Sequence, residues 1–360
     1  MRKSIDPGLS IYFDLVRILA AIIVVLHHVW PLIFATFPLP WPGHEAVVVF
    51  FVLSGYVIAY SANNPSSSFA SYAGHRAARI LSVAIPALVL AAAVLPFASG
   101  SNIPNAGPVQ IAPEDFLFST LINTVFLGQS FGMNVAPPLN GPFWSICYEV
   151  WYYIIFAAWM YSSKRWRIAL TVLALAVAGL KIVILMPVWL LGVWLFHYMP
   201  KMTKQQALTL FGASAFAALT FYWTGASHLI RGQTIMLAPE FMTNLRGSNQ
   251  FIGDLILGAF VTAHFAAAAS LGPYLAPLRL IESKIRYVSS YTLSTYLYHM
   301  PLAVLIWNGL GVHDALGFLC LMTGFIVVLG MLSERRVRFF RRVLRKLTDV
   351  TVLRRVAGIS

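Results

Sequence analysis

The stretch YFDLVRILAAIIVVLHHVWPL, residues 12–32, decides how the rest of the sequence is interpreted. It is apolar apart from Asp14, Arg17 and a pair of histidines. At a rise of about 1.5 Å per residue, a helix of this length measures about 30 Å, which matches the hydrocarbon thickness of a bilayer. Similar apolar runs recur to the far end of the chain. The sequence therefore predicts an all-α fold, a polytopic transmembrane helical bundle.

The composition excludes several classes of protein. Of the 360 residues, 59% are hydrophobic and only 10% are charged. A soluble domain carries about 25% charged residues, so neither an ordinary cytosolic enzyme nor a disordered chain fits. The two cysteines, Cys147 and Cys320, both lie inside apolar runs. They are expected to be small buried hydrophobic residues, without a disulfide framework or a metal site.

We predict about ten spans, with boundaries good to a few residues. They cover about 12–32, 45–61, 80–97, 143–161, 167–182, 184–199, 205–224, 250–271, 287–310 and 315–332. The segment 116–130 is apolar but short, and it contains Asn123, Thr124 and Gln129. Such a segment is typical of a re-entrant or interfacial element rather than a full span.

The distribution of basic residues predicts the orientation. Most Lys and Arg lie in the N-terminal segment, in alternate connections and in the C-terminal tail. Because cytoplasmic segments carry the excess of Lys and Arg, both termini are predicted to be cytoplasmic. This topology also accounts for most of the net charge of +13 without a nucleic-acid partner. We expect a transmembrane domain over 1–333 and a basic juxtamembrane cytoplasmic tail over 334–360, which would contact anionic headgroups.

Two ionisable residues of the first span face the same side. Arg17 and His28 are eleven positions apart, which is about three helical turns. A charged group at the centre of a bilayer costs at least a few kcal/mol, so each needs a partner or a function. Asp14 lies one turn before Arg17 and is positioned to pair with it. Arg17 is thus an Asp-paired anchor or a functional cation, and His28 is a packing residue or a functional base.

Glu149 and a pair of arginines are the next candidates. Glu149 lies among aromatic residues, so it must be protonated or paired, and Arg17 and His28 are candidate partners. A purely structural ion pair is the alternative. Arg76 and Arg79 share one helix face at the cytoplasmic end of the third span. They either anchor the helix at the membrane surface or bind phosphate groups, for which paired guanidiniums are suited.

Two small motifs complete the candidates. Ser54 and Gly55 form a patch of small residues that allows close helix approach. His299 lies two residues before Pro301, and a proline inside a span frees a backbone carbonyl and often bends the helix. Both features have purely structural explanations, and both residues could also line a substrate path.

Six motifs occur in a fixed order along the chain. They are Asp14 and Arg17 followed by His28, FFVLSGY at 50–56, RAARI at 76–80, WSICYE at 144–149, TYLYHMP at 295–301 and SER at 333–335. In this order and at these separations they resemble the acyltransferase 3 family, the membrane-bound bacterial O-acyltransferases of cell-surface glycans. The sequence departs from the pattern of that family at Val48, Val150, Leu293 and Arg336.

The resemblance implies O-acetylation in the cell envelope. An acyl group, usually acetyl, would pass from cytoplasmic acetyl-CoA to a hydroxyl of an extracytoplasmic polysaccharide, glycan or glycoside, either free or lipid-linked. The protein would be a multi-pass protein of the bacterial inner membrane. Its partners would be acyl-CoA, the carbohydrate acceptor and membrane lipids, with no metal cofactor and no nucleic acid.

The resemblance also suggests a role for each candidate residue. The expected catalytic residues are His28 as general base, Glu149 as the group that orients it, and Arg17. The expected ligands of the acyl-CoA phosphates are Arg17, Arg76 and Arg79, and the expected substrate-path residues are Ser54, Tyr56, Trp144 and His299. A covalent acyl-enzyme on His28 or Ser54 remains an open variant.

A rival interpretation is an ion-coupled transporter or a flippase of a glycan precursor. Intramembrane Arg, His and Glu also suit ion-coupled translocation. Transporters often show repeated halves with paired broken helices, and we find no internal repeat in this sequence. A catalytically silent scaffold is a third interpretation.

Overall fold

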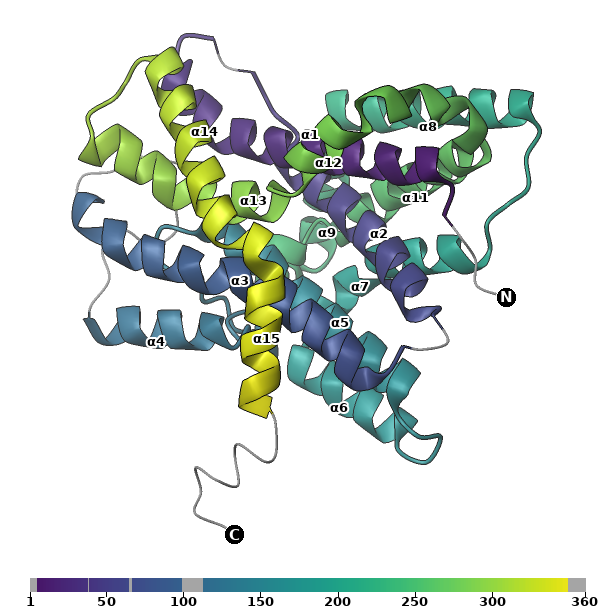
Figure 1. Ribbon diagram of the computed structural model, residues 1–360, viewed down its shortest axis with the longest axis horizontal. Helices are drawn as coiled ribbons and strands as arrows, with labels where there is room; N and C mark the ends of the chain where they lie inside the picture. The colour runs from purple at the N-terminus through teal and green to yellow at the C-terminus, as the bar shows by residue number, and fades with distance from the viewer. Residues whose placement is uncertain (1–4, 38, 65–66, 99–112, 349–360) are drawn as a thin grey trace.

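The computed structural model describes residues 5–37, 39–64, 67–98 and 113–348. Within this part of the chain every regular element is a helix, as predicted (Figure 1). The α-helices are α1 (Pro7–Ile33), α2 (Gly43–Ala62), α3 (Phe69–Val94), α4 (Pro113–Thr124), α5 (Trp144–Tyr161), α6 (Arg167–Ala178), α7 (Leu180–His197), α8 (Lys204–Trp223), α9 (Ala226–Leu237), α10 (Pro239–Leu245), α11 (Phe251–Ser270), α12 (Glu282–Ser289), α13 (Thr292–Val304), α14 (Ala315–Leu332) and α15 (Val337–Thr348).

Each of the ten expected spans contains a helix, but fewer helices have the length and hydropathy of a complete span. Among the described residues, six stretches qualify: α1, α2, α3 with its continuation to Phe97, α7, α11 and Ala315–Lys346. Helices α8 and α9 form a pair bent by 56° that would make a seventh. The class of multi-pass membrane protein is confirmed. The count of ten and the cytoplasmic position of the termini stay predictions.

The short helix α6 explains part of the difference. Helix α6 has 12 residues and is therefore about 18 Å long, less than the hydrocarbon thickness of a bilayer. It ends at Gly179, whose φ of 82° is accessible to glycine at little cost, and α7 begins at the next residue. The sequence analysis placed this break between residues 182 and 184, a few residues after its position in the structure. Helix α4 also has 12 residues, and it occupies part of the segment 116–130.

Lys181 at the start of α7 is buried, with 2% of its surface exposed. Its ammonium group donates hydrogen bonds to Gln129 Oε1 at 3.0 Å and to the Met133 carbonyl. Nearby, Trp151 Nε1 donates to the Phe126 carbonyl at 3.1 Å. These contacts hold the non-helical chain after α4 against α5 and α7. A buried cation is tolerated here because backbone and amide oxygens solvate it.

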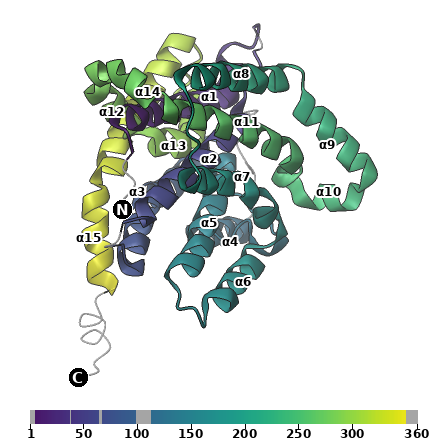
Figure 2. The same cartoon turned by 90° about the vertical axis from the view of Figure 1, so that its right-hand side faces the viewer.

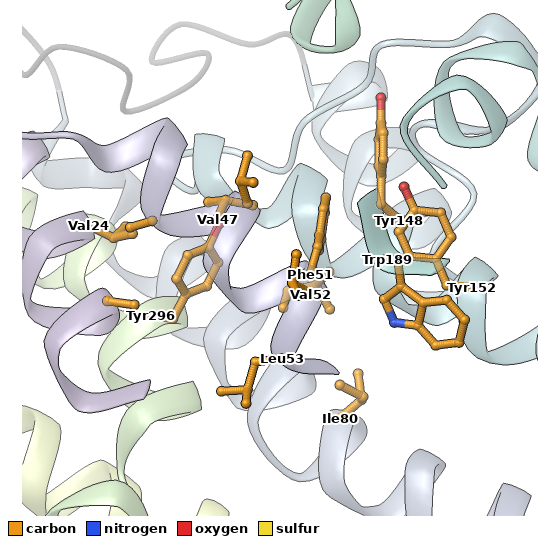
Figure 3. Packing of buried hydrophobic residues seen from close by; sticks show 14 of the residues in the cluster. Val24, Val47, Phe51, Val52, Leu53, Ile80, Tyr148, Tyr152, Trp189 and Tyr296 are labelled. Carbon is orange, nitrogen blue, oxygen red and sulfur yellow. The ribbon is translucent and has the colours of Figure 1, made fainter. Parts of the chain in front are cut away.

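Helices α2 and α7 approach each other closely in the core, where Phe51 and Val52 of α2 and Trp189 of α7 belong to one hydrophobic cluster (Figure 3). A Cβ atom placed on Gly55 would lie 2.0 Å from the Trp189 carbonyl oxygen, and one placed on Gly192 would lie 1.9 Å from that of Val52. Only glycine fits at these two positions. The predicted packing role of the Ser54–Gly55 patch is thus confirmed for Gly55, and the partner surface on α7 is also a glycine.

Residues that follow α14 pack against the helical bundle. The Glu334 carboxylate accepts the backbone N–H groups of Leu293 at 3.3 Å and Ser294 at 2.8 Å, which caps the start of α13. Arg335 Nη1 donates to the Tyr291 hydroxyl at 2.8 Å. Helix α15 then packs against α3 (Figures 1 and 2). The first residues of the predicted tail therefore belong to the bundle, while its residues 349–360 lie outside the described part of the chain.

The glycine contact between α2 and α7 gives a stability prediction. Gly192→Ala forces two backbones apart, and overpacking of this kind costs about 1–3 kcal/mol. Gly212→Ala in α8 is the matched control, because nothing lies within 4 Å of a Cβ built there. We expect a lower thermal unfolding temperature in detergent for Gly192→Ala and no decrease for Gly212→Ala. Equal unfolding temperatures for the two variants would contradict the packing described for α2 and α7.

The orientation predicted from the basic residues can be tested by labelling single cysteines. Ser71, Ser163 and Thr224 are exposed positions near the ends of helices. In a background without Cys147 and Cys320, cysteines at Ser71 and Ser163 should react from the cytoplasmic side. A cysteine at Thr224 should react with a membrane-impermeant reagent from the opposite side. Reaction of all three from one side would exclude the predicted topology.

Candidate active site

A cavity of about 100 Å³ lies where α1, α2, α3, α5 and α13 meet. Five of the residues that the sequence singled out line it. They are Arg17, Ser54, Arg76, Arg79 and Glu149. These residues come from four helices, so the fold gathers side chains that are far apart along the chain. The cavity thus places three guanidiniums opposite one carboxylate in a largely apolar bundle.

Arg17 is held by the carboxylate predicted to pair with it. Its Nη1 atom lies 3.0 Å from Asp14 Oδ1. Asp14 Oδ2 also pairs with Arg286 Nη1 at 3.0 Å, and Ser289 Oγ donates to Asp14 Oδ1 at 3.0 Å. Both of these partners lie on α12. Asp14 therefore fixes the rotamer of Arg17 while the Arg17 guanidinium still borders the cavity.

Arg76 has an unused hydrogen-bond donor. Its Nη2 atom donates to Ser61 Oγ at 3.2 Å, and its guanidinium lies 5.9 Å from the ring centroids of both Tyr72 and Tyr153. Its Nε atom is buried and has no hydrogen-bond partner in the described part of the chain. A buried donor without a partner carries a desolvation cost, which an oxygen-rich ligand would remove.

Glu149 is bound by hydroxyl groups. Ser54 Oγ donates to Glu149 Oε1 at 2.6 Å, and the Tyr153 hydroxyl donates to the same atom. Trp189 Nε1 in turn donates to Ser54 Oγ at 3.2 Å. The contacts of Glu149 are thus not with Arg17 or His28, which the sequence analysis considered as partners. Sequence reasoning missed Tyr153, although its place four residues after Glu149 on one helix face was a usable signal.

His28 lies beside a second histidine rather than beside Glu149. His28 Nδ1 is 3.2 Å from His299 Nε2 and 2.9 Å from the Val24 carbonyl oxygen. The two imidazole centroids are 5.0 Å apart. The expectation that Glu149 orients His28 is therefore corrected. The group beside His28 Nδ1, where an orienting residue would lie, is the imidazole of His299. The two rings meet because α13 packs against α1.

Tyr296 lies next to both the cavity and this histidine pair. It lines the cavity, and its ring centroid lies 6.2 Å from that of His299. Its hydroxyl donates to the Pro142 carbonyl at 3.0 Å and lies 2.6 Å from Ser145 Oγ. His28 does not line the cavity. Tyr296 therefore borders both the cavity and the histidine pair.

The two remaining path candidates lie elsewhere. Tyr56 is 3% exposed and packs edge-on against Phe13, with ring centroids 5.1 Å apart. Trp144 stacks on His44, whose Nε2 lies 2.9 Å from Asp254 Oδ1. Neither Tyr56 nor Trp144 lines the cavity. The described residues also contain no group of three or more His, Cys, Asp or Glu arranged to hold a metal ion.

Comparison with known proteins agrees with the family suggested by the motifs. The family model described as "Acyltransferase domain" (Acyl_transf_3) matches residues 10–335. The chain is also similar to an "O-acetyl transferase" of Shigella phage Sf6, with 29% identity over 172 residues, covering 45% of this chain and 49% of that protein. The alignment thus spans about half the length of this relative, and no solved structure matches. Because the family model covers nearly the whole chain, from α1 to the Glu334–Arg335 contacts, the protein belongs to the acyltransferase 3 family.

Proposed function

We propose that the protein is an integral-membrane O-acyltransferase. It moves an acyl group, acetyl in the simplest case, from cytoplasmic acyl-CoA to a hydroxyl of an extracytoplasmic glycan or glycoside. The observation that carries the proposal is the cavity lined by Arg17, Arg76 and Arg79 in a chain of this family. The name of the phage relative supports acetyl as the group transferred.

The guanidiniums are suited to the phosphates of the donor. Acyl-CoA carries several phosphate groups, and bidentate guanidinium contacts to phosphate oxygens are strong and charge-assisted. The unpartnered Nε of Arg76 would gain an acceptor from such a ligand. By the predicted orientation, Arg76 and Arg79 lie at the cytoplasmic end of α3, where acyl-CoA is present. Glu149 is the one carboxylate that lines the cavity beside the three guanidiniums, and Asp14 pairs with Arg17 from outside the lining.

The acyl group then has to reach His28. Eleven residues of helix separate His28 from Arg17, which is about 16 Å along α1. The pantetheine arm of the donor is long and narrow enough to follow this direction. In the proposed route it passes Tyr296, so the hydroxyl contacts of Tyr296 with Pro142 and Ser145 open when the donor enters.

At His28 the proposed chemistry is general-base catalysis. The imidazole takes the proton of the acceptor hydroxyl as the hydroxyl oxygen attacks the thioester carbonyl carbon. A carbon–oxygen bond forms and the carbon–sulfur bond breaks. The CoA thiolate leaves and takes the proton back from the imidazolium. Asp14, through its ion pair, keeps Arg17 in the cavity while this occurs.

The proposal predicts that two substitutions abolish acylation in cells. In strains with His28→Ala or Arg17→Ala at wild-type protein levels, ester-linked acyl groups on the surface glycan should fall about 100-fold or more, the usual range for loss of a general base. His27→Ala is the matched control, because the His27 Nδ1 atom lies 2.7 Å from the Trp41 carbonyl and takes no part in the proposed reaction. Persistence of acylation in both the His28 and the Arg17 variants would refute the proposed roles.

Thioester turnover separates this proposal from its rivals. Purified protein mixed with acetyl-CoA and an acceptor glycoside should release free CoA thiol. A transporter, a flippase or a silent scaffold would release none. Release that continues unchanged after His28→Ala would exclude His28 as the base while leaving the acyltransferase activity in place.

A further inference from the structure

His28 and His299 form a pair of imidazoles in which every ring nitrogen but one has a hydrogen-bond contact. His299 Nδ1 lies 2.7 Å from the Tyr296 carbonyl oxygen and 3.2 Å from that of Thr295. His299 Nε2 faces His28 Nδ1 at 3.2 Å, and His28 Nδ1 also lies 2.9 Å from the Val24 carbonyl oxygen. His28 Nε2 is the nitrogen without such a contact among the described residues.

These contacts determine where the protons are. A carbonyl oxygen only accepts hydrogen bonds, so the Nδ1 atoms of both rings must carry hydrogen. The proton between the rings is then the one on His28 Nδ1, and His299 Nε2 must offer a lone pair to it. His299 is therefore neutral. When His28 is neutral as well, its Nε2 atom carries the unshared pair that a base needs.

We propose that His299 is the positioning residue that holds His28 in the tautomer with an unprotonated Nε2. This inference rests on the proposed role of His28 as general base. As His28 Nε2 takes the proton of the acceptor hydroxyl, the Nδ1–H of the resulting imidazolium continues to donate to His299 Nε2. His299 thus has the position that a carboxylate has in a catalytic triad, with a neutral acceptor in place of an anion.

The Val24 carbonyl alone is a weaker determinant of the tautomer. In an α-helix this carbonyl already accepts the backbone N–H of His28, four residues later. The Val24 carbonyl oxygen therefore accepts two hydrogen bonds, one from the backbone N–H of His28 and one from its imidazole. His299 Nε2 has no competing donor among the described residues, and it approaches His28 from a different helix. It thereby fixes the ring orientation of His28 as well as its proton.

His299 itself is held rigidly. Its side chain is fully buried, and Pro301 follows two residues later in α13. Proline has no N–H, so the carbonyl of Leu297 loses its helical donor, as expected from the sequence. Asn140 Nδ2 donates to that carbonyl at 2.9 Å instead. The backbone segment that carries His299 is thus hydrogen-bonded to the turn that precedes α5, while burial and the Nδ1 contact with the Tyr296 carbonyl restrict the imidazole itself.

Two substitutions distinguish a positioning role from simple packing. His299→Gln keeps an oxygen acceptor near His28 Nδ1, whereas His299→Leu fills similar space without one. We expect kcat for thiol release to fall about 100-fold in His299→Leu, with the KM for acetyl-CoA unchanged, because His299 does not line the cavity. His299→Gln should stay within about 10-fold of wild type. Equal unfolding temperatures of the two variants in detergent would show that the difference is not one of folding.

The tautomer is measured directly by nitrogen NMR of histidine-labelled protein, with His28→Gln used to assign the signals. We expect His28 Nδ1 protonated and Nε2 unprotonated in the wild type and in His299→Gln, and a mixture of tautomers in His299→Leu. A proton on Nε2 in the wild type would overturn the inference, and so would a single unchanged tautomer in His299→Leu. This measurement needs no turnover, so absence of thiol release would refute the proposed function without deciding the tautomer.

Discussion

The ion pair between Arg17 and Asp14 is the contact on which the cavity depends. A guanidinium inside a membrane helix costs at least a few kcal/mol unless it is neutralised, and Asp14 lies 3.0 Å from it on the same helix. Asp14 also accepts hydrogen bonds from Arg286 and Ser289, and these two bonds connect α1 to α12. With Arg17 neutralised in this way, the fold can bring Arg76 and Arg79 to the same cavity.

The helical bundle therefore contains two chemically different groups of side chains, those that line the cavity and the His28–His299 pair. The cavity is lined by three guanidiniums and is suited to phosphate groups, whereas the His28–His299 pair has one ring nitrogen, His28 Nε2, without a hydrogen-bond contact among the described residues. Tyr296 belongs to both, because its side chain lines the cavity and its carbonyl accepts a hydrogen bond from His299. Separate sites for binding the donor and for proton transfer are what a reaction across a membrane requires.

Much of this arrangement was predictable from the sequence. Apolar runs indicated the helices. Arg17 and Glu149 were identified because charged groups in such runs need partners, Arg76 and Arg79 because paired guanidiniums suit phosphate, and Ser54 because it lies in a patch of small residues. The partners themselves were less predictable. His28 and His299 are 271 residues apart, and their contact depends on the rotation of two packed helices, which no local pattern encodes. The break between α6 and α7 was predicted between residues 182 and 184, a few residues after its position at Gly179 in the structure.

The most direct test of the account is a cryo-electron-microscopy structure of the protein with a non-hydrolysable thioether analogue of acetyl-CoA. The account predicts that phosphate groups of the analogue contact Arg17, Arg76 and Arg79, that Tyr296 is displaced, and that the sulfur lies close to His28 Nε2. An analogue bound with its phosphates away from these guanidiniums, or with its sulfur on the far side of an unmoved Tyr296, would contradict it.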